Sequence, residues 1–180
     1  SEMCIRDRIK TFNDLAGNSL GITRLGVLRM DVDDLGKVFM TGLGSHATLS
    51  RLASLSRMLG IFFNGYINTL LRPHRDKTYL IYSGGDDIFL VAPWSLVPEL
   101  ALQIRNQFSK FSCHNPHLSL SGGATLVPEK YPLYKAAQLA GEAEDKAKDF
   151  QRPKGWAKDA FNFLGLTVGW EELELSLIHI

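Results

Sequence analysis

The chain has 180 residues, of which 45% are hydrophobic and 22% charged, so it is long enough to bury the core of one globular domain. Its formal net charge of +1 excludes a surface that is basic throughout and binds nucleic acid by charge alone. No apolar run approaches the roughly 20 residues that span a bilayer, and the two cysteines, Cys4 and Cys113, match no disulfide or zinc spacing. These features predict a cytoplasmic protein with no membrane span.

The two ends of the chain differ in character from the rest. Both resemble translated sequencing adapter more than natural protein, and that likeness, not composition, is the basis for setting them aside. We expect a non-native leader at 1–8 and a non-native tail at 174–180, with the domain at 9–173. The chain would then be a fragment of a longer protein.

The first elements are a strand and a long helix. Arg24–Met30 has the length and β-branched content of a buried strand, and it runs into the acidic segment Asp31–Gly36 (Asp-Val-Asp-Asp-Leu-Gly). From Leu49 to Leu71 apolar residues recur at three- and four-residue steps, which predicts an amphipathic helix that ends before Pro73.

A hairpin is expected next. Two apolar runs, Tyr79–Tyr82 and Ile88–Val91, flank the sequence Ser-Gly-Gly-Asp-Asp at 83–87. Because glycine adopts positive φ without a steric penalty, this segment predicts the tight turn of a β-hairpin.

The second half of the chain repeats the alternation of helix and strand. The spacing predicts a helix over Leu96–Phe111, a strand over Leu118–Val127 and an alanine-rich helix over Leu133–Phe150. Residues 151–157 are expected to form a loop, and those after it a weak helical or capping segment.

The predicted order, β-α-β-β-α-β-α, gives an α+β fold class. It is the ferredoxin-like arrangement βαββαβ, with helices on one face of an antiparallel sheet. In this topology the first and third strands are antiparallel neighbours, so the end of the first lies beside the tip of the hairpin. Asp31 and the pair Asp86 and Asp87, distant in sequence, are therefore expected to converge.

Crowded carboxylates indicate a metal site. Their mutual repulsion is relieved by a divalent cation, and hard oxygen ligands select Mg²⁺ or Mn²⁺ over zinc. Two such ions about 4 Å apart would clamp the attacking and leaving oxygens of a displacement at phosphorus. Glycines in the hairpin would let a substrate approach the backbone closely.

A simpler interpretation of the hairpin is a turn with no further role, because Ser, Gly and Asp are common turn residues. The separate acidic cluster at Asp31 favours the metal site, since two acidic segments meet in one predicted place. Asp33 and Asp34 are open to another role, because either can cap the helix that follows.

Three segments together resemble a known family: Asp31–Gly36, Tyr82–Asp87 and Glu142–Lys148. They are similar to the second palm domain of the large subunit of type III CRISPR effectors, a nucleotidyl cyclase/polymerase-like fold. The finer match is to the type III-A form and includes Lys130–Pro132, 158–165 and 170–172. The resemblance covers roughly residues 24–173.

The resemblance implies a metal-dependent nucleotidyltransferase that makes cyclic oligoadenylate from ATP, releases pyrophosphate and uses two Mg²⁺ or Mn²⁺ ions. It implies as partners the first palm and HD nuclease domains of the same subunit, other effector subunits, and crRNA and target RNA through the complex, in a prokaryotic cytoplasm. Because the chain contains no first palm, we expect it to have little or no activity alone.

The resemblance also assigns residues by position. It implies metal binding by Asp31, Val32, Asp86 and Asp87, of which the three aspartates are catalytic. It implies nucleotide binding by Ser83, Gly84, Gly85, Gly36 and Lys148. Lys148 would contact the triphosphate, with Lys146 as an alternative on the same predicted helix.

Two other functions stay open. A diguanylate cyclase shares this palm, but that family has Glu-Phe where this chain has Asp87-Ile88, and a guanine-reading Asn-Asp where Phe39-Met40 stand. A non-catalytic scaffold palm within an RNA-binding complex would need no acidic triad, so binding of metal and ATP separates it from an enzyme.

Overall fold

A computed structural model describes residues 11–42, 44–151 and 157–178, so the expected leader at 1–8 lies outside the described residues. The strands are β1 (Leu25–Val32), β2 (Tyr79–Gly84), β3 (Asp87–Pro93), β4 (Leu120–Val127), β5 (Ala160–Phe163) and β6 (Leu166–Gly169). The α-helices are α1 (Phe12–Gly17), α2 (Leu35–Thr41), α3 (Leu49–Gly60), α4 (Ile67–Leu70), α5 (Val97–Phe111), α6 (Leu133–Lys148) and α7 (Trp170–Ile178). Among the described residues no helix is long and apolar enough to cross a bilayer.

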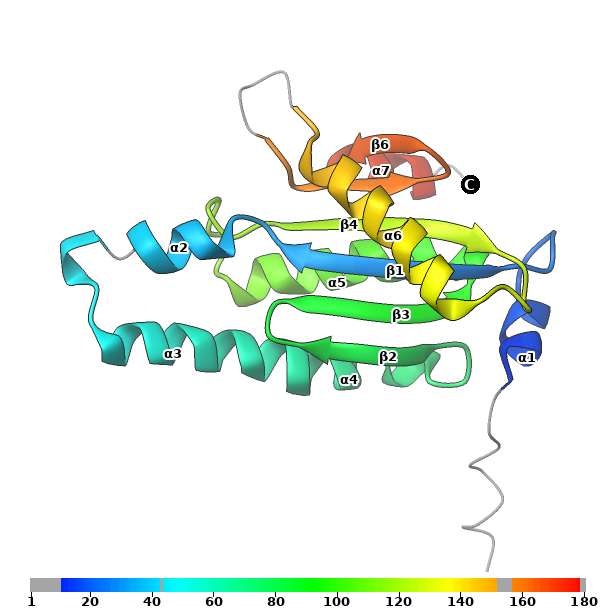
Figure 1. Cartoon of the computed structure of the whole chain (residues 1–180), viewed down its shortest axis with the longest axis horizontal. Coiled ribbons are helices and arrows are strands. Elements are labelled where there is room, and N and C mark those ends of the chain that lie inside the picture. The colour runs from blue at the N-terminus through cyan, green and yellow to red at the C-terminus, as the bar shows by residue number, and fades with distance from the viewer. Residues whose placement is uncertain (1–10, 43, 152–156, 179–180) are drawn as a thin grey trace, which may run out of the picture.

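The strands form one sheet in the order β2-β3-β1-β4-β5-β6 (Figure 1). The first four are antiparallel neighbours in the ferredoxin-like order, which confirms the predicted fold. β5 adds to β4 in parallel, and β6 closes the sheet antiparallel to β5. The sheet is therefore mixed at this edge and antiparallel elsewhere.

Helices cover both faces of the sheet, whereas the sequence predicted one. α3, α4 and α5 pack on one face against alternate β1 residues, including Leu28 and Met30. The other face carries α1 and α6, which pack against Leu25 and Val27. Figure 1 shows α6 in front of β1 and α5 behind the sheet. The reason is that successive β1 residues point to opposite faces and both sets are apolar, so each face needs a cover.

The predicted helix over 49–71 forms as a nearly continuous rod. α3 passes into a π-helical turn at Ile61–Tyr66 and then into α4. Such wide turns leave main-chain carbonyls available to other partners and recur at functional sites.

The C-terminal segment corrects another prediction, because it contains a β-hairpin before its helix. β5 and β6 have four residues each, too short to show a period of two in the sequence. Their turn has Leu164 at φ 52° and Gly165 at φ 83°, and a leucine there carries no turn signal. α7 is anchored by Trp170, which is 1% exposed and stacks on Phe161. α7 runs through most of the expected tail at 174–180, whose non-native origin stays a prediction.

Candidate active site

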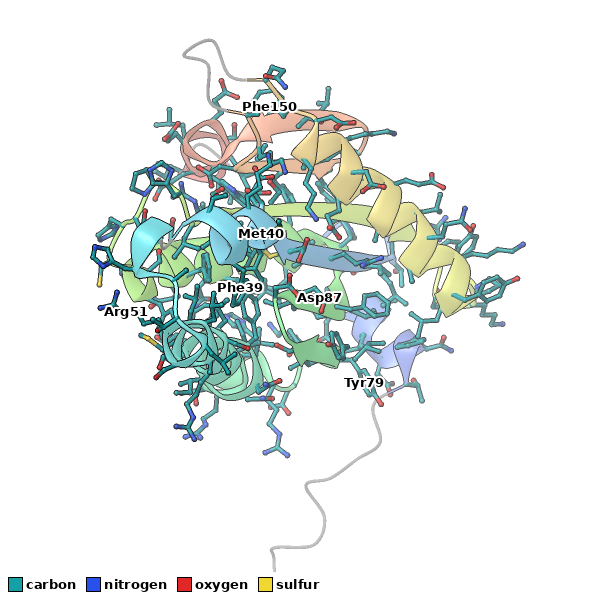
Figure 2. The ribbon with its side chains drawn as sticks, turned by 60° about the vertical axis from the view of Figure 1, so that its left-hand side comes forward. Phe39, Met40, Arg51, Tyr79, Asp87 and Phe150 are labelled. Atoms are coloured by element: carbon teal, nitrogen blue, oxygen red, sulfur yellow. The ribbon has the colours of Figure 1, made fainter. Side chains whose placement is uncertain are left out.

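The three carboxylates predicted to converge lie at one end of the sheet. Asp31, near the end of β1, is the register partner of Asp87, the first residue of β3. Asp86 directly precedes it in the hairpin turn. Figure 2 shows Asp87 at the end of the sheet where α2 carries Phe39 and Met40. The predicted convergence therefore follows from the strand order.

The hairpin tip is fixed in place. Gly84 and Asp87 pair across the hairpin and leave Gly85 and Asp86 as its two-residue loop. Gly85 has a φ of 65° and Asp86 is not among the residues with positive φ, the signs of a type II′ turn, which favours glycine first. The Val32 N–H donates to the Asp86 carbonyl at 3.2 Å. This bond ties the tip to β1 and holds Asp86 beside the other carboxylates.

The closeness of the three carboxylates shifts the pKa values of Asp86 and Asp87. Partial burial, followed by the negative charges of Asp31 and Asp87, raises the pKa of the Asp86 carboxyl. Burial and the charge of Asp31 also raise the pKa of Asp87, although Arg29 opposes the shift. The ionised forms therefore repel one another at this end of the sheet.

Lys148, from the last turn of α6, supplies a cation to the cluster. Its ammonium donates to the Asp31 carboxylate and lies 2.8 Å from the Glu144 carboxylate. Burial lowers the pKa of Lys148, but these two carboxylates raise it by more, so the net shift is upward. Lys146, the alternative, is exposed, so Lys148 is the lysine that reaches the acidic site.

The residues fit a divalent metal ion in their chemistry. Within the described residues, no three His, Cys, Asp or Glu side chains are grouped so as to hold a metal as they stand, and the Asp31 carboxylate contacts Lys148 instead. Nevertheless Asp31, Asp86 and Asp87 are neighbouring carboxylates whose negative charges repel one another, and they offer the oxygen ligands that Mg²⁺ and Mn²⁺ prefer. A ligand at Val32 could only be its carbonyl, because its side chain is apolar.

The predicted nucleotide-binding residues of the hairpin lie beside the π-helical turn. The Ser83 hydroxyl donates to the Phe63 carbonyl at 2.6 Å, so its proton is engaged and its oxygen can only accept from a nucleotide. A Cβ at Gly84 would lie 2.8 Å from the Asn64 side-chain oxygen. Glycine at this position leaves room for the Asn64 side chain, which would otherwise have to turn away.

The segment around Gly36 was predicted to contact the nucleotide and to cap the helix that follows. Gly36 is exposed in the first turn of α2, and its predicted contact with nucleotide stays a prediction. Asp34 stands at the N-cap position but forms no capping bond, because its carboxylate pairs with Lys37 and Lys158, each at 2.9 Å. Asp33 is buried and accepts from the Ser119 hydroxyl at 2.7 Å. Neither aspartate caps α2 with its side chain.

Two charged residues of the site were not predicted. Arg29 lies two residues before Asp31 on the same face of β1, and its Nε lies 3.5 Å from the Glu144 carboxylate. Glu144 lies in the segment Glu142–Lys148 that resembles the family, but no role was predicted for it from the sequence. Its four-residue spacing from Lys148 is that of an ion pair on a helix and could have indicated one. Arg29 gave no comparable signal, since a lone arginine in an apolar strand has no motif.

A cavity of about 650 Å³ opens on the other side of β1. Its lining includes Asp33 and Asp34 but none of the three clustered carboxylates. The charges around it are largely paired with one another, as in the bond of Arg105 to Asp159 at 3.0 Å. The acidic site thus lies on the α6 face, apart from this cavity.

A protein-family model described as Cas10/Cmr2, second palm domain, matches residues 24–157. The chain belongs to this family. The predicted resemblance to the second palm of the type III-A large subunit is thereby confirmed.

Similar proteins agree in family and fold. This palm chain is 38% identical over 184 residues to a CRISPR system single-strand-specific deoxyribonuclease Cas10/Csm1 (subtype III-A) of Methanocaldococcus jannaschii, covering 91% of this chain and 23% of that protein. It is similar to the Csm1–Csm4 cassette in complex with AMPPNP, with a TM-score of 0.81, 28% identity, and coverage of 94% of this chain and 26% of the other. The cassette in complex with cA4 gives a TM-score of 0.77, 29% identity, and coverage of 91% and 25%. The chain thus spans about a quarter of its relatives' length.

Proposed function

We propose that this palm domain is the part of a type III CRISPR effector subunit that makes cyclic oligoadenylate from ATP with release of pyrophosphate. The observation that carries the proposal is the register pairing of Asp31 with Asp87, with Asp86 beside them on a glycine turn. Support comes from similar structures that hold the ATP analogue AMPPNP and the cyclic oligoadenylate cA4. The deoxyribonuclease name belongs to a relative of which this chain covers 23%.

The acidic cluster would hold two Mg²⁺ or Mn²⁺ ions through Asp31, Asp86, Asp87 and the carbonyl of Val32. Bound metal would acidify a ribose 3′-hydroxyl and neutralise charge on the departing pyrophosphate. Gly85, exposed at the hairpin tip, would leave the backbone open to the nucleotide, whereas Gly84 is buried against Asn64.

The remaining site residues would bind the nucleotide itself. The Lys148 ammonium would bind the triphosphate, since it lies beside the carboxylates and is a compact cation suited to phosphate. Ser83 would accept a hydrogen bond from the nucleotide, because its proton is engaged by the Phe63 carbonyl. Gly36 would offer its N–H at the first turn of α2.

The complete activity would need parts outside this chain. The chain covers about a quarter of the Csm1 chain in cassettes with Csm4, so we propose that it works with the first palm and HD nuclease of its own subunit and with a Csm4-like neighbour. The crRNA and target RNA would act through the assembled complex in a prokaryotic cytoplasm.

Binding of ATP should depend on metal. We expect the complete subunit to bind ATP with Mg²⁺ or Mn²⁺ and to lose about tenfold or more in affinity when the metal is chelated, because the carboxylates and the triphosphate otherwise repel each other. Isothermal titration calorimetry with and without EDTA measures this. Equal affinity in both conditions would instead favour a scaffold palm.

Adenine should be accepted in preference to guanine. At the positions of the diguanylate cyclase's guanine-reading pair, Phe39 packs against the core and Met40 is 83% exposed (Figure 2). Neither can hydrogen-bond the guanine edge, so we expect at least about a tenfold higher kcat/KM for ATP than for GTP. Parallel assays with the two nucleotides measure it, and cyclic di-GMP as the main product would contradict the proposal.

A further inference from the structure

A chain of alternating charges runs along the face of β1 that α6 covers. Arg29 meets Glu144 at 3.5 Å, Glu144 meets Lys148 at 2.8 Å, and Lys148 contacts Asp31. Glu144 and Lys148 stand one turn apart on α6, with Glu144 on the inner side. The Lys148 ammonium is thus shared between two carboxylates, only one of which belongs to the acidic cluster.

Packing alone does not explain a glutamate at this position. The Glu144 side chain is 7% exposed, and burial raises the pKa of its carboxyl against the opposing effect of Lys148. Its Oε2 forms no hydrogen bond and lies 3.5 Å from the Arg29 Nε, so the cost of burying this charge is only partly offset. The neighbouring inward positions of α6 are alanines, which fill the interface without charge: Ala136, Ala140, Ala143 and Ala147.

Gly123 brings Glu144 down onto the sheet. A Cβ at Gly123 would lie 2.0 Å from the Glu144 main-chain nitrogen, so only glycine permits this close contact of α6 with β4. The close approach of α6 to the sheet therefore brings Glu144 to Arg29 and Lys148 to Asp31, both residues of β1. A glutamate at position 145 would face solvent, as exposed Asp145 does.

We propose that Glu144 is a positioning residue that holds the Lys148 ammonium at the acidic site when a divalent metal ion takes Asp31. The proposal rests on the proposed function. A dication on Asp31 repels the ammonium, and a lysine on its flexible stem would then turn to solvent. The Glu144 carboxylate is not one of the proposed metal ligands, so it remains available to Lys148. It keeps the ammonium on the inner face of α6. From there it can bind the triphosphate.

This arrangement predicts that replacing Lys148 changes the affinities for Mn²⁺ and for ATP in opposite directions. Because Lys148 and metal compete for Asp31, Lys148→Met should tighten the binding of Mn²⁺ alone by several-fold. The same variant should weaken ATP binding by about tenfold, since a charge-assisted hydrogen bond is lost, and leave AMP binding unchanged. Glu144→Gln should weaken ATP binding several-fold without tightening Mn²⁺, because Asp31 keeps the lysine.

The experiment uses the complete large subunit with its partner subunits. Electron paramagnetic resonance measures free Mn²⁺ without nucleotide, and calorimetry with Mg²⁺ measures the affinities for ATP and AMP. Glu142→Gln is the matched control, because Glu142 lies two residues before Glu144 on the exposed side of α6. Its carboxylate accepts a hydrogen bond from the Gln138 side-chain amide at 3.0 Å. It should change no affinity by more than about twofold.

The variants also separate a structural role from a positioning role. Glu144→Asp keeps the charge with one methylene fewer and should recover part of the ATP-over-AMP preference that Glu144→Gln loses. Equal losses of this preference in both variants, or ATP and AMP affinities that fall together, would overturn the proposal in favour of a packing role for Glu144.

If Lys148→Met weakens the binding of ATP while Glu144→Gln does not, the phosphate role of Lys148 stands and the role of Glu144 is refuted. If the unaltered subunit fails to bind ATP with metal, the proposed function itself is wrong.

Discussion

Replacing Asp86 and Asp87 together by alanine is expected to lower oligoadenylate synthesis by the complete complex about a thousandfold or more. Metal ligation contributes several kcal/mol to stabilising charge in the transition state, and each 1.4 kcal/mol corresponds to a factor of ten. Asp31→Ala should act almost as strongly, because β1 and β3 each contribute a carboxylate to the same cluster. Labelled ATP and separation of the products measure the rate.

The control for this loss is a change of the same kind outside the site. Asp145→Ala removes a carboxylate from the exposed side of α6 and should leave synthesis within about twofold of the unaltered complex. All variants should assemble normally, since the aspartates repel one another and the ion pair that Asp31→Ala loses, to Lys148, is partly exposed. Near-normal synthesis by the Asp86 and Asp87 double variant would refute the assignment of the site.

Gly123→Ala should destabilise the fold by about 3 kcal/mol or more. The added Cβ would lie 2.0 Å from the Glu144 nitrogen and 2.4 Å from the Ala143 carbonyl carbon, both main-chain atoms of α6 that no side-chain rotation can move. α6 must therefore shift away from β4, which also displaces Lys148 from Asp31. Urea denaturation measures the change in the free energy of unfolding.

The control for this strain is Gly65→Ala, in the π-helical turn. A Cβ at Gly65 would meet no atom within 4 Å, so we expect a change of less than about 1 kcal/mol. If Gly123→Ala proved equally mild, the close contact between α6 and β4 would not be what sets the height of the helix.

The central fold was predictable because its signals are local and repeated. Helical spacing over 49–71 and the Gly-Gly turn between two apolar runs fixed the order of elements. The ferredoxin-like strand order is then sufficient to predict that Asp31 and Asp87 are neighbours. The convergence of the carboxylates is a consequence of strand order, which the sequence pattern determines.

The rest depended on tertiary contacts that no local pattern reports. β5 is stabilised by pairing with β4 and by the stacking of Trp170 on Phe161, and β6 by pairing with β5, rather than by their own short sequences. The close approach of α6 to the second face depends on a glycine in β4, which in sequence indicates only a weak strand. The bond from Ser83 to Phe63 depends on a π-helical turn, which hydrophobic spacing does not distinguish from an α-helix.

The most direct test of the proposed function is the identity of the product made from ATP. The complete effector complex, with target RNA and Mg²⁺ or Mn²⁺, is incubated with ATP and the products are identified by mass spectrometry. We predict cyclic oligoadenylate and pyrophosphate, both absent when Asp86 and Asp87 are replaced by alanine. Unchanged ATP in the presence of an assembled complex, or cyclic product that persists in the double variant, would contradict the proposal that this palm is the synthetic site.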